Sequence, residues 1–236
     1  MASAVPPPPL IVADGVSRTY HLGAAAVPAV RAVSLAIAPG EFVALRGPSG
    51  SGKTTLLNLL GLLDSPDPGS GRVVVEGRDA KGLSENQRSD LRRDRFGFVF
   101  QTFNLIPVLT SEENVAYPMV LAQVPAADRR RRARALLQSV GLAGKEDVRP
   151  DLLSGGQRQR VAIARALANE PAVVFADEPT ANLDSHTSEE ILDLMREINA
   201  SRRVAFLFAT HDPLVVARAR RVVTLHDGAV ESDVAA

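Results

Sequence analysis

The sequence lacks several features that would narrow its class. None of its 236 residues is cysteine, which excludes a disulfide framework, a thiolate metal site and a cysteine nucleophile. No stretch approaches the ~18 consecutive apolar residues of a membrane-spanning helix. The formal net charge is zero, so the composition has no nucleic-acid footprint and we expect no nucleic-acid partner. Lysine is scarce, since the chain contains only Lys53, Lys81 and Lys145, and a lysine inside a motif is therefore harder to attribute to chance.

The composition of the chain is typical of a folded domain. Hydrophobic residues make up 45% of the chain, enough for one large domain or one core with an inserted lobe. Residues 1–9 are small and proline-rich, without a basic start or an apolar segment, so we expect a disordered tail and no secretory signal. We predict one domain over residues 10–236, with a helical lobe inserted at residues 103–160.

One glycine-rich stretch organises this domain. Residues 47–54 have the pattern G-x-x-x-x-G-K-[ST], in which glycines let successive backbone N–H groups point at a phosphate chain. Residues 41–45 before it predict a buried strand and residues 54–60 after it predict a helix, so a bound phosphate would face a helix N-terminus. Lys53 is then expected to reach the β and γ phosphates, and the Thr54 hydroxyl to bind Mg²⁺.

Further polar residues follow apolar runs that predict buried strands. They are Gln101 after residues 96–100, Asp177 and Glu178 after residues 171–176, and His211 after residues 204–209. In open α/β sheets ligands bind at the carboxyl ends of strands, so these side chains are candidates for one site. Gln101 either only closes its strand or contacts both Mg²⁺ and the attacking water, and His211 is either structural or functional.

The adjacent carboxylates are informative, because two charges at the end of a buried strand are costly unless they meet a cation or water. Side chains alternate along a strand. Asp177 can therefore face Mg²⁺ below the glycine-rich loop of residues 47–54, known as a P-loop, while Glu178 faces a water near the γ-phosphate.

A second candidate phosphate site begins at Ser154. This residue is a good N-cap for the helix that follows, and Gly155 and Gly156 leave the backbone open to close approach. Either an ordinary capped helix or a second phosphate-facing helix start fits this stretch. Two other features also have two interpretations. Tyr20 is a surface aromatic or a platform for a base, and the arginines of residues 129–132 form a solvated face or contact a partner or an anionic lipid surface.

Two strand predictions rest on local pattern alone. Residues 30–38 alternate weakly and are expected to pair with residues 41–45 across the turn at Pro39. Residues 221–225 predict the last strand of the chain, before a turn at Asp227.

Taken together, residues 20–228 resemble the ATPase subunits of ABC transporters. The most specific match is Leu153-Ser154-Gly155-Gly156-Gln157, which is similar to the signature of that family. The resemblance implies an α/β fold with a P-loop NTPase core, a mixed sheet and the inserted helical lobe. It also implies hydrolysis of ATP with Mg²⁺ by in-line attack of water. No Asn-Lys-x-Asp motif is present, which argues against a GTPase.

The resemblance implies a role for each motif. Tyr20 would stack on adenine, Glu178 would be the general base, and His211 would sense the γ-phosphate. In this family two ATPase domains pack head to tail, so that residues 154–157 of one cover the ATP of the other. The implied catalytic residues are Gln101, Glu178 and His211, the implied metal-binding residues are Thr54, Gln101 and Asp177, and the implied nucleotide-binding residues are Tyr20, Gly47, Pro48, Ser49, Gly50, Ser51, Gly52, Lys53, Thr54, Thr55, Ser154, Gly155, Gly156, Gln157 and Asp184.

Within the family, residues 47–58, 61–64 and 98–107 are similar to the group that serves lipoprotein release, macrolide export and FtsE-like cell division. This similarity implies a homodimer of ATPase subunits acting on an integral membrane permease on a separate chain, at the cytoplasmic face of the inner membrane. An FtsE-like ATPase that signals across the membrane without transport is an alternative. A soluble ABC ATPase acting on DNA or the ribosome is disfavoured, because the chain has one P-loop, no heptad run and no basic patch.

Replacing Lys53 tests the P-loop interpretation. Lys53→Ala removes a point charge expected on the β and γ phosphates, and a hydrogen bond to a charged group contributes about 1.5–3 kcal/mol. Equilibrium binding of ATP should therefore weaken roughly tenfold or more, whereas Lys145→Ala, outside the motif, should bind normally. Unchanged affinity and turnover in Lys53→Ala would mean that the glycine-rich loop is not the phosphate site.

Overall fold

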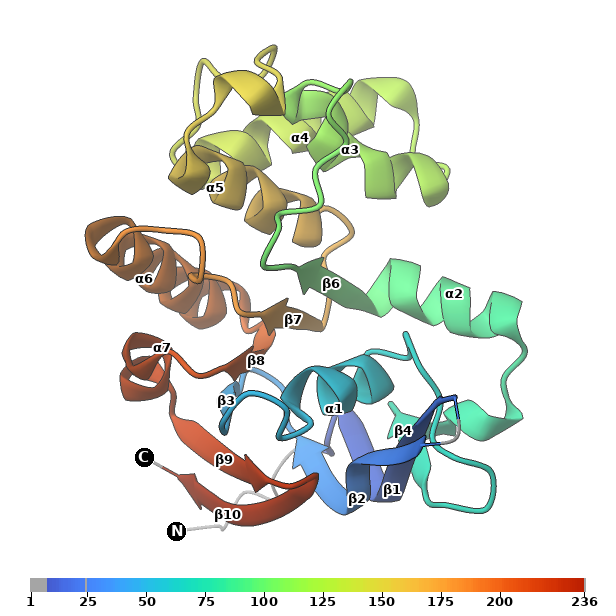
Figure 1. Cartoon of the computed structure of the whole chain (residues 1–236). Coiled ribbons are helices and arrows are strands. Elements are labelled where there is room, and N and C mark those ends of the chain that lie inside the picture. The colour runs from blue at the N-terminus through green and yellow to red at the C-terminus, as the bar shows by residue number, and fades with distance from the viewer. Residues whose placement is uncertain (1–7, 24, 236) are drawn as a thin grey trace, which may run out of the picture.

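The computed structural model describes residues 8–23 and 25–235, whose arrangement Figure 1 shows. The predicted tail over residues 1–9 lies almost wholly outside these ranges. One sheet has six strands, in the order β10 (Ala229–Ala235), β9 (Arg221–His226), β3 (Phe42–Arg46), β8 (Ala205–Thr210), β7 (Val173–Asp177) and β6 (Phe96–Val99). Neighbouring strands in it are parallel, except that β10 is antiparallel to β9. The predicted α/β fold with a mixed sheet is therefore confirmed.

The second sheet corrects one prediction. It is antiparallel, in the order β2 (Ala25–Ile37), β1 (Ile11–Leu22), β4 (Arg72–Val75) and β5 (Arg78–Asp79). The expected pairing of residues 30–38 with residues 41–45 is wrong, because β2 pairs with β1 while β3 lies between β8 and β9. Buried and exposed residues alternate at the end of β2, as in a half-buried strand, whereas the first four residues of β3 are all buried. A continuously buried strand is typical of the centre of a parallel sheet.

The chain also continues past its predicted last strand. Asp227 and Gly228 both adopt positive φ, 46° and 80°, as the tight turns of β-hairpins require. The turn at Asp227 is thus where it was predicted, but β10 follows it and pairs back onto β9. This strand escaped prediction because its residues are mostly exposed and its apolar pattern is weak.

Helices cover the six-stranded sheet on both faces. The helices of the described ranges are α1 (Lys53–Leu60), α2 (Glu85–Arg95), α3 (Ser111–Leu121), α4 (Ala126–Ser139), α5 (Gly155–Ala166), α6 (Ser185–Arg202) and α7 (Pro213–Arg218), with short 3-10 helices at Ala80–Gly82 and Pro150–Leu152. In Figure 1, α3, α4 and α5 gather at the top, away from β1, β2 and β4. We propose to treat residues 103–160 as a helical lobe, because α3 and α4 pack on each other and on α5. No helix within the described ranges is long and apolar enough to cross a membrane.

Alternation along β8 divides the core into two parts. Phe206 and Phe208 pack into a cluster with side chains of α3, α4, α5 and α6. Leu207 and Ala209 pack into a second cluster with α1, β1, β2 and β4. Each of these four side chains is fully buried, and burial of one Phe or Leu side chain contributes roughly 1.5–3 kcal/mol. Both halves of the core therefore hold β8 in place, and with it Thr210 at its end.

Gly97 offers a test of the contact between the end of α5 and the sheet. A Cβ at this position would lie 2.3 Å from the carbonyl oxygen of Ala166, so β6 and α5 approach backbone to backbone. Gly97→Ala should force them apart and lower the free energy of unfolding by about 1–3 kcal/mol, measured by urea denaturation. Gly82→Ala is the control, because a Cβ there meets nothing within 4 Å. Equal stability of the two variants would contradict the close packing.

Candidate functional site

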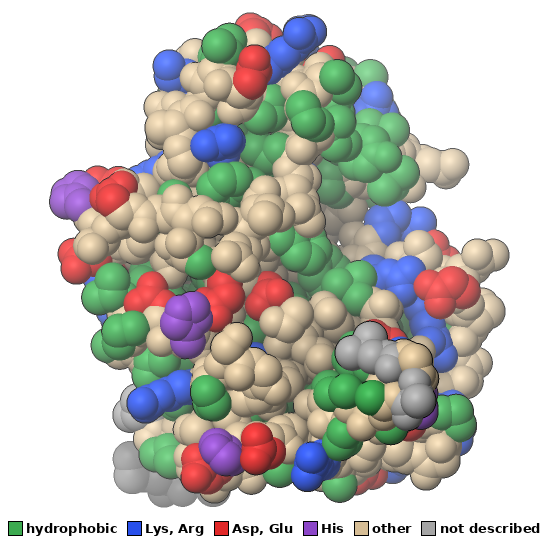
Figure 2. Space-filling view, viewed as in Figure 1, with side chains coloured by type: hydrophobic (Ala, Val, Ile, Leu, Met, Phe, Trp, Pro, Cys, Tyr) green, Lys and Arg blue, Asp and Glu red, His purple; other side chains and the backbone are tan. Residues whose placement is uncertain are grey.

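One cavity of about 700 Å³ collects most of the predicted site. It lies where the loop between β3 and α1 faces the carboxyl ends of β6, β7 and β8. Figure 2 shows acidic side chains and a histidine gathered on this face, between the lobe and the β9–β10 hairpin. The cavity is lined by Tyr20, Ala29, Pro48, Ser49, Gly50, Gly52, Lys53, Thr54, Thr55, Gln101, Asp177, Glu178 and His211.

The glycine-rich loop of this cavity accepts no larger residues at two of its positions. Gly52, the residue before α1, has φ of 97°, and a Cβ there would lie 2.2 Å from the carbonyl oxygen of Ala29 on β2. A Cβ at Gly47 would lie 2.3 Å from the carbonyl oxygen of Leu225 on β9. The loop is therefore packed closely against strands of both sheets, β2 and β9.

Lys53 is the cation of this loop. Its Nζ donates to the carbonyl oxygens of Gly47, at 2.8 Å, and Pro48, at 2.9 Å. The residue is only 7% exposed. Its buried ammonium group is therefore hydrogen-bonded to neutral carbonyl groups and to no carboxylate among the described residues. A phosphate in the cavity would supply the missing negative charge. The Ser51 side chain instead lies buried beneath the loop, 2% exposed and outside the cavity lining.

Thr54 and Asp177 form a pair of oxygens that fits Mg²⁺. Two oxygens in neighbouring octahedral positions on one Mg²⁺ are about 3.0 Å apart, because each lies about 2.1 Å from the ion. Thr54 Oγ1 and Asp177 Oδ1 are 3.0 Å apart. Among the described residues no three His, Cys, Asp or Glu side chains gather as metal ligands. The pair of one hydroxyl and one carboxylate suits Mg²⁺, which usually takes one or two carboxylates and completes its shell with waters and substrate phosphates.

Burial makes the Asp177 carboxyl group harder to ionise. It raises the pKa of the Asp177 carboxyl group; the hydrogen bond from Thr54 opposes this rise, and the neighbouring charge of Glu178 adds to it. The cost of ionising a partly buried carboxylate disappears when a cation arrives. A cation bound beside Asp177 would therefore favour the ionised form of this carboxyl group.

Glu178 is held in place by two side chains of the β8 end. Its φ of 44° is uncommon for a residue of this size. Oε1 lies 2.6 Å from His211 Nδ1, and Oε2 accepts a hydrogen bond of 3.0 Å from Thr210 Oγ1. The Glu178 side chain is 16% exposed and that of His211 is 71% exposed. A carboxylate that lines an open cavity, next to the predicted phosphate loop, is placed to accept a proton from water.

Gln101, which follows β6, and Tyr20, on β1, both line this cavity. The carbonyl oxygen of Gln101 accepts a 2.8 Å hydrogen bond from Asn182 Nδ2, while its side chain is exposed. The Tyr20 hydroxyl donates to Asp64 at 2.9 Å, and the Arg18 guanidinium lies 5.0 Å from the centre of the Tyr20 ring. One face of that ring is thus already covered by a cation. Stacking of adenine on Tyr20 stays a prediction.

The signature residues lie elsewhere. Ser154 caps α5 in a reciprocal pair of hydrogen bonds with Gln157, at 3.3 and 3.1 Å. A Cβ at Gly156 would lie 2.5 Å from Thr187 Cγ2, and the Asp184 carboxylate caps α6 by accepting from the Thr187 N–H at 2.9 Å. We call Ser154, Gly155, Gly156, Gln157 and Asp184 the signature cluster. None of its members lines the cavity of the same chain.

Three residues near the site escaped the sequence reasoning. Thr210 contacts Glu178, Thr180 Oγ1 donates to Asp212 Oδ2 at 2.7 Å, and Asn182 contacts Gln101. Each lies within four residues of a predicted site residue. The available signal was a hydroxyl or amide side chain directly beside a motif, although such residues are common in loops and carry little information by themselves.

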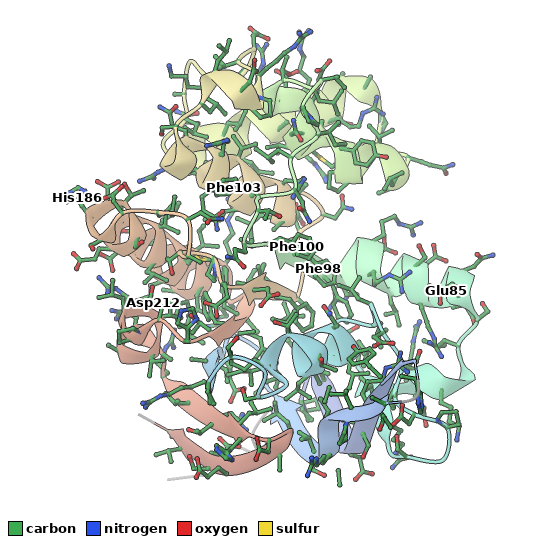
Figure 3. All side chains as sticks on the ribbon, viewed as in Figure 1. Glu85, Phe98, Phe100, Phe103, His186 and Asp212 are labelled. Atoms are coloured by element: carbon green, nitrogen blue, oxygen red, sulfur yellow. The ribbon has the colours of Figure 1, made fainter. Side chains whose placement is uncertain are left out.

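A second groove, of about 480 Å³, opens between α2, the end of β6 and the lobe. Phe98 and Phe100, which Figure 3 labels near β6, line this groove. Their rings stack with centroids 6.0 Å apart. Leu63, Tyr117 and Leu121 also line it and are 46%, 42% and 56% exposed. Most of the surface of this groove is apolar, although Arg92, Arg93 and Arg165 also line it.

Comparison with known proteins gives consistent results. The ABC transporter family profile matches residues 30–181. A macrolide export ATP-binding/permease protein, MacB, of Syntrophobacter fumaroxidans is 49% identical over 226 residues, which make up 95% of this chain and 31% of that protein. An uncharacterized ABC transporter ATP-binding protein of Thermotoga maritima is 47% identical over 214 residues, 91% of this chain and 90% of that protein. The chain spans about a third of the length of the MacB relatives it matches.

A solved structure extends the likeness to three dimensions. It is a dimeric ATP-binding cassette in a post-hydrolysis state with ADP and Pi, 41% identical to this chain. The TM-score is 0.87, and the match covers 95% of this chain and 98% of the other.

Replacing Asp177 should stabilise the nucleotide-free protein. Because the pKa of this carboxyl group is raised on folding, its ionisation destabilises the fold as pH rises through the folded-state pKa, and the penalty is absent below the unfolded-state pKa. In EDTA at pH 7, Asp177→Asn should therefore have a higher thermal midpoint than the unmodified chain. Thr187 hydrogen bonds lower the pKa of Asp184, so Asp184→Asn should show no such gain. A midpoint for Asp177→Asn at or below the unmodified value would contradict this electrostatic account.

Proposed function

Because this chain belongs to the ABC transporter family of ATPases, we propose that it binds ATP with Mg²⁺ and hydrolyses it to drive a membrane permease. The observation that carries this proposal is the convergence of Lys53, Thr54, Asp177, Glu178 and His211 on one cavity from three separate strand ends. A phosphate loop, a cation site and a carboxylate are the parts that phosphoryl transfer to water needs.

Each side chain has a chemical task in this proposal. Lys53 and the N-terminus of α1 hold the phosphate chain. Thr54, Asp177 and Gln101 would hold Mg²⁺, and the bound ion would supply positive charge beside the phosphates. Glu178 accepts a proton from the attacking water, while the water oxygen bonds to the γ-phosphorus and the bond to the bridging oxygen breaks.

We further propose that the signature cluster completes the site of a second copy of the chain. Ser154 begins α5 with a capped helix start, which presents backbone N–H groups to an anion, yet the cluster lies outside the cavity of its own chain. A second copy would bring it over the phosphates. The dimeric state of the similar cassette supports this arrangement.

The apolar groove along Phe98 and Phe100 is our proposed contact with the permease. Its exposed apolar side chains suit a helix of another protein, and it adjoins the segment that follows Gln101. Such a contact places the chain at the cytoplasmic face of the membrane. We propose that the permease is a separate polypeptide, because the Thermotoga relative, which this chain matches over most of its length, is named only as an ATP-binding protein. We also propose that the transport is of the lipoprotein-release or macrolide-export type, which the names of the MacB relatives support.

Trapping ATP tests both the general base and the dimer. Glu178→Gln keeps the shape of the side chain but cannot accept a proton, and a positioned base contributes about 10²–10⁴-fold to the rate. Phosphate release should nearly stop while ATP binding persists. Because ATP then binds the closed dimer without being cleaved, light scattering should detect a dimer with ATP–Mg²⁺ and a monomer with ADP.

A second substitution makes the dimer test specific. Adding Ser154→Arg to Glu178→Gln should abolish the ATP-dependent dimer, because a bulky cation blocks close approach at the start of α5. Adding Ser201→Arg, at the far end of α6, should leave the dimer intact. Wild-type turnover in Glu178→Gln would refute the base, and a dimer indifferent to Ser154→Arg would refute the shared site.

A further inference from the structure

Two buried threonines connect the loop after β7 to the end of β8 and the residues that follow it. Thr210 is 0% exposed and Thr180 is 3% exposed. Thr210 Oγ1 contacts Glu178 Oε2 at 3.0 Å, and Thr180 Oγ1 contacts Asp212 Oδ2 at 2.7 Å. Asp212 begins α7, where Figure 3 labels it. Thr210 thus donates from the β8 side to Glu178, and Thr180 donates from the β7 side to Asp212. Only the contact of Thr210 involves the proposed general base, Glu178.

The hydrogen-bond partners determine how the Thr210 hydroxyl is oriented. Its oxygen accepts from the backbone N–H of Asp212 at 2.9 Å. The hydroxyl has one proton to donate, and its acceptor in the described chain is Glu178 Oε2. Because Thr210 lies at the end of the buried strand β8, the donor has little freedom to move. Oε2 is therefore held by a fixed, buried group.

The other carboxylate oxygen has a different kind of partner. Oε1 contacts His211 Nδ1 at 2.6 Å, and the His211 side chain is 71% exposed. An exposed imidazole can swing away, whereas a fully buried threonine cannot. If His211 moved away, Glu178 Oε1 would be exposed to the cavity, while Oε2 would keep its hydrogen bond to Thr210.

Glu178 needs such a fixed partner. Its φ of 44° lies in a region that costs of order 1–3 kcal/mol for ordinary residues and persists where surrounding contacts over-determine it. Its backbone N–H donates to the carbonyl oxygen of Ala209 at 2.9 Å, which fixes the main chain. Thr210, the residue after Ala209, fixes the side chain.

We propose that Thr210 is a positioning residue for Glu178. It holds Oε2 so that Oε1 is the oxygen that accepts the proton of the attacking water. The inference rests on the proposed ATPase function. It predicts that removing the Thr210 hydroxyl slows turnover of bound ATP without weakening ATP binding, since Thr210 does not line the nucleotide cavity.

The test measures phosphate release by the full chain across a range of ATP and Mg²⁺ concentrations. Thr210→Val replaces the hydroxyl by a methyl group of similar size and should lower kcat roughly tenfold or more, a part of the contribution of a positioned base, with KM within about twofold. Thr210→Ser keeps the hydroxyl and should recover most of kcat. Thr180→Val removes an equally buried hydroxyl that does not touch Glu178 and should keep kcat within about twofold of the unmodified chain.

A double variant separates positioning from a general structural effect. If Thr210 acts through Glu178, then Glu178→Gln combined with Thr210→Val should turn over no more slowly than Glu178→Gln alone. If Thr210→Val fails to fold, Thr210→Ala takes its place and decides the same question.

Three results would overturn the inference: unchanged kcat in Thr210→Val, equal loss in Thr210→Ser, or equal loss in Thr180→Val. Failure of the underlying function gives a different result. Wild-type turnover in Glu178→Gln would refute the proposed base itself, whereas an inactive Glu178→Gln beside a fully active Thr210→Val refutes only the role of Thr210.

Discussion

The parallel alignment of β3, β7 and β8 is the constraint on which the site depends. Arg46 at the end of β3 pairs with Thr210 at the end of β8, and Ala209 pairs with Asp177 at the end of β7. Parallel strands finish at the same edge of a sheet, so whatever follows each strand is delivered to one place. Thr54 and Asp177 are 123 residues apart in sequence and share a hydrogen bond. The buried core on both sides of β8 holds this register.

Several residues at that edge of the sheet have an unfavourable charge environment or backbone conformation. Lys53 is nearly buried against carbonyl oxygens, Asp177 has a raised pKa, and Glu178 has a positive φ. Strain and perturbed charge cluster where a protein handles its ligand, because the ligand removes the cost. The rigid frame around the edge carries that cost, and in the proposed function ATP and Mg²⁺ would reduce it.

The signature cluster extends this logic beyond one chain. Its helix start is well capped within the protein, so its own fold does not require an anion. Nevertheless Gly156 and Asp184 both approach Thr187 closely, which holds the starts of α5 and α6 together. The segment after Gln101 is tied to the same region, because Asn182 donates to the Gln101 carbonyl oxygen. In a dimer, the cavity, the cluster and the apolar groove would thus be linked through short, rigid contacts.

Local pattern was enough to predict most elements and most of the cavity. The glycine-rich loop, the apolar runs ending in Gln101, Asp177 and His211, and the cap at Ser154 all depend on neighbours in sequence, so the residues themselves determined them. The partner of β2, the existence of β10, the distance of the signature cluster from the cavity and the contact between Thr210 and Glu178 were decided only in three dimensions. The reason is that a strand's partner and a side chain's neighbour depend on which buried surfaces meet, and those surfaces come from segments far apart in the chain.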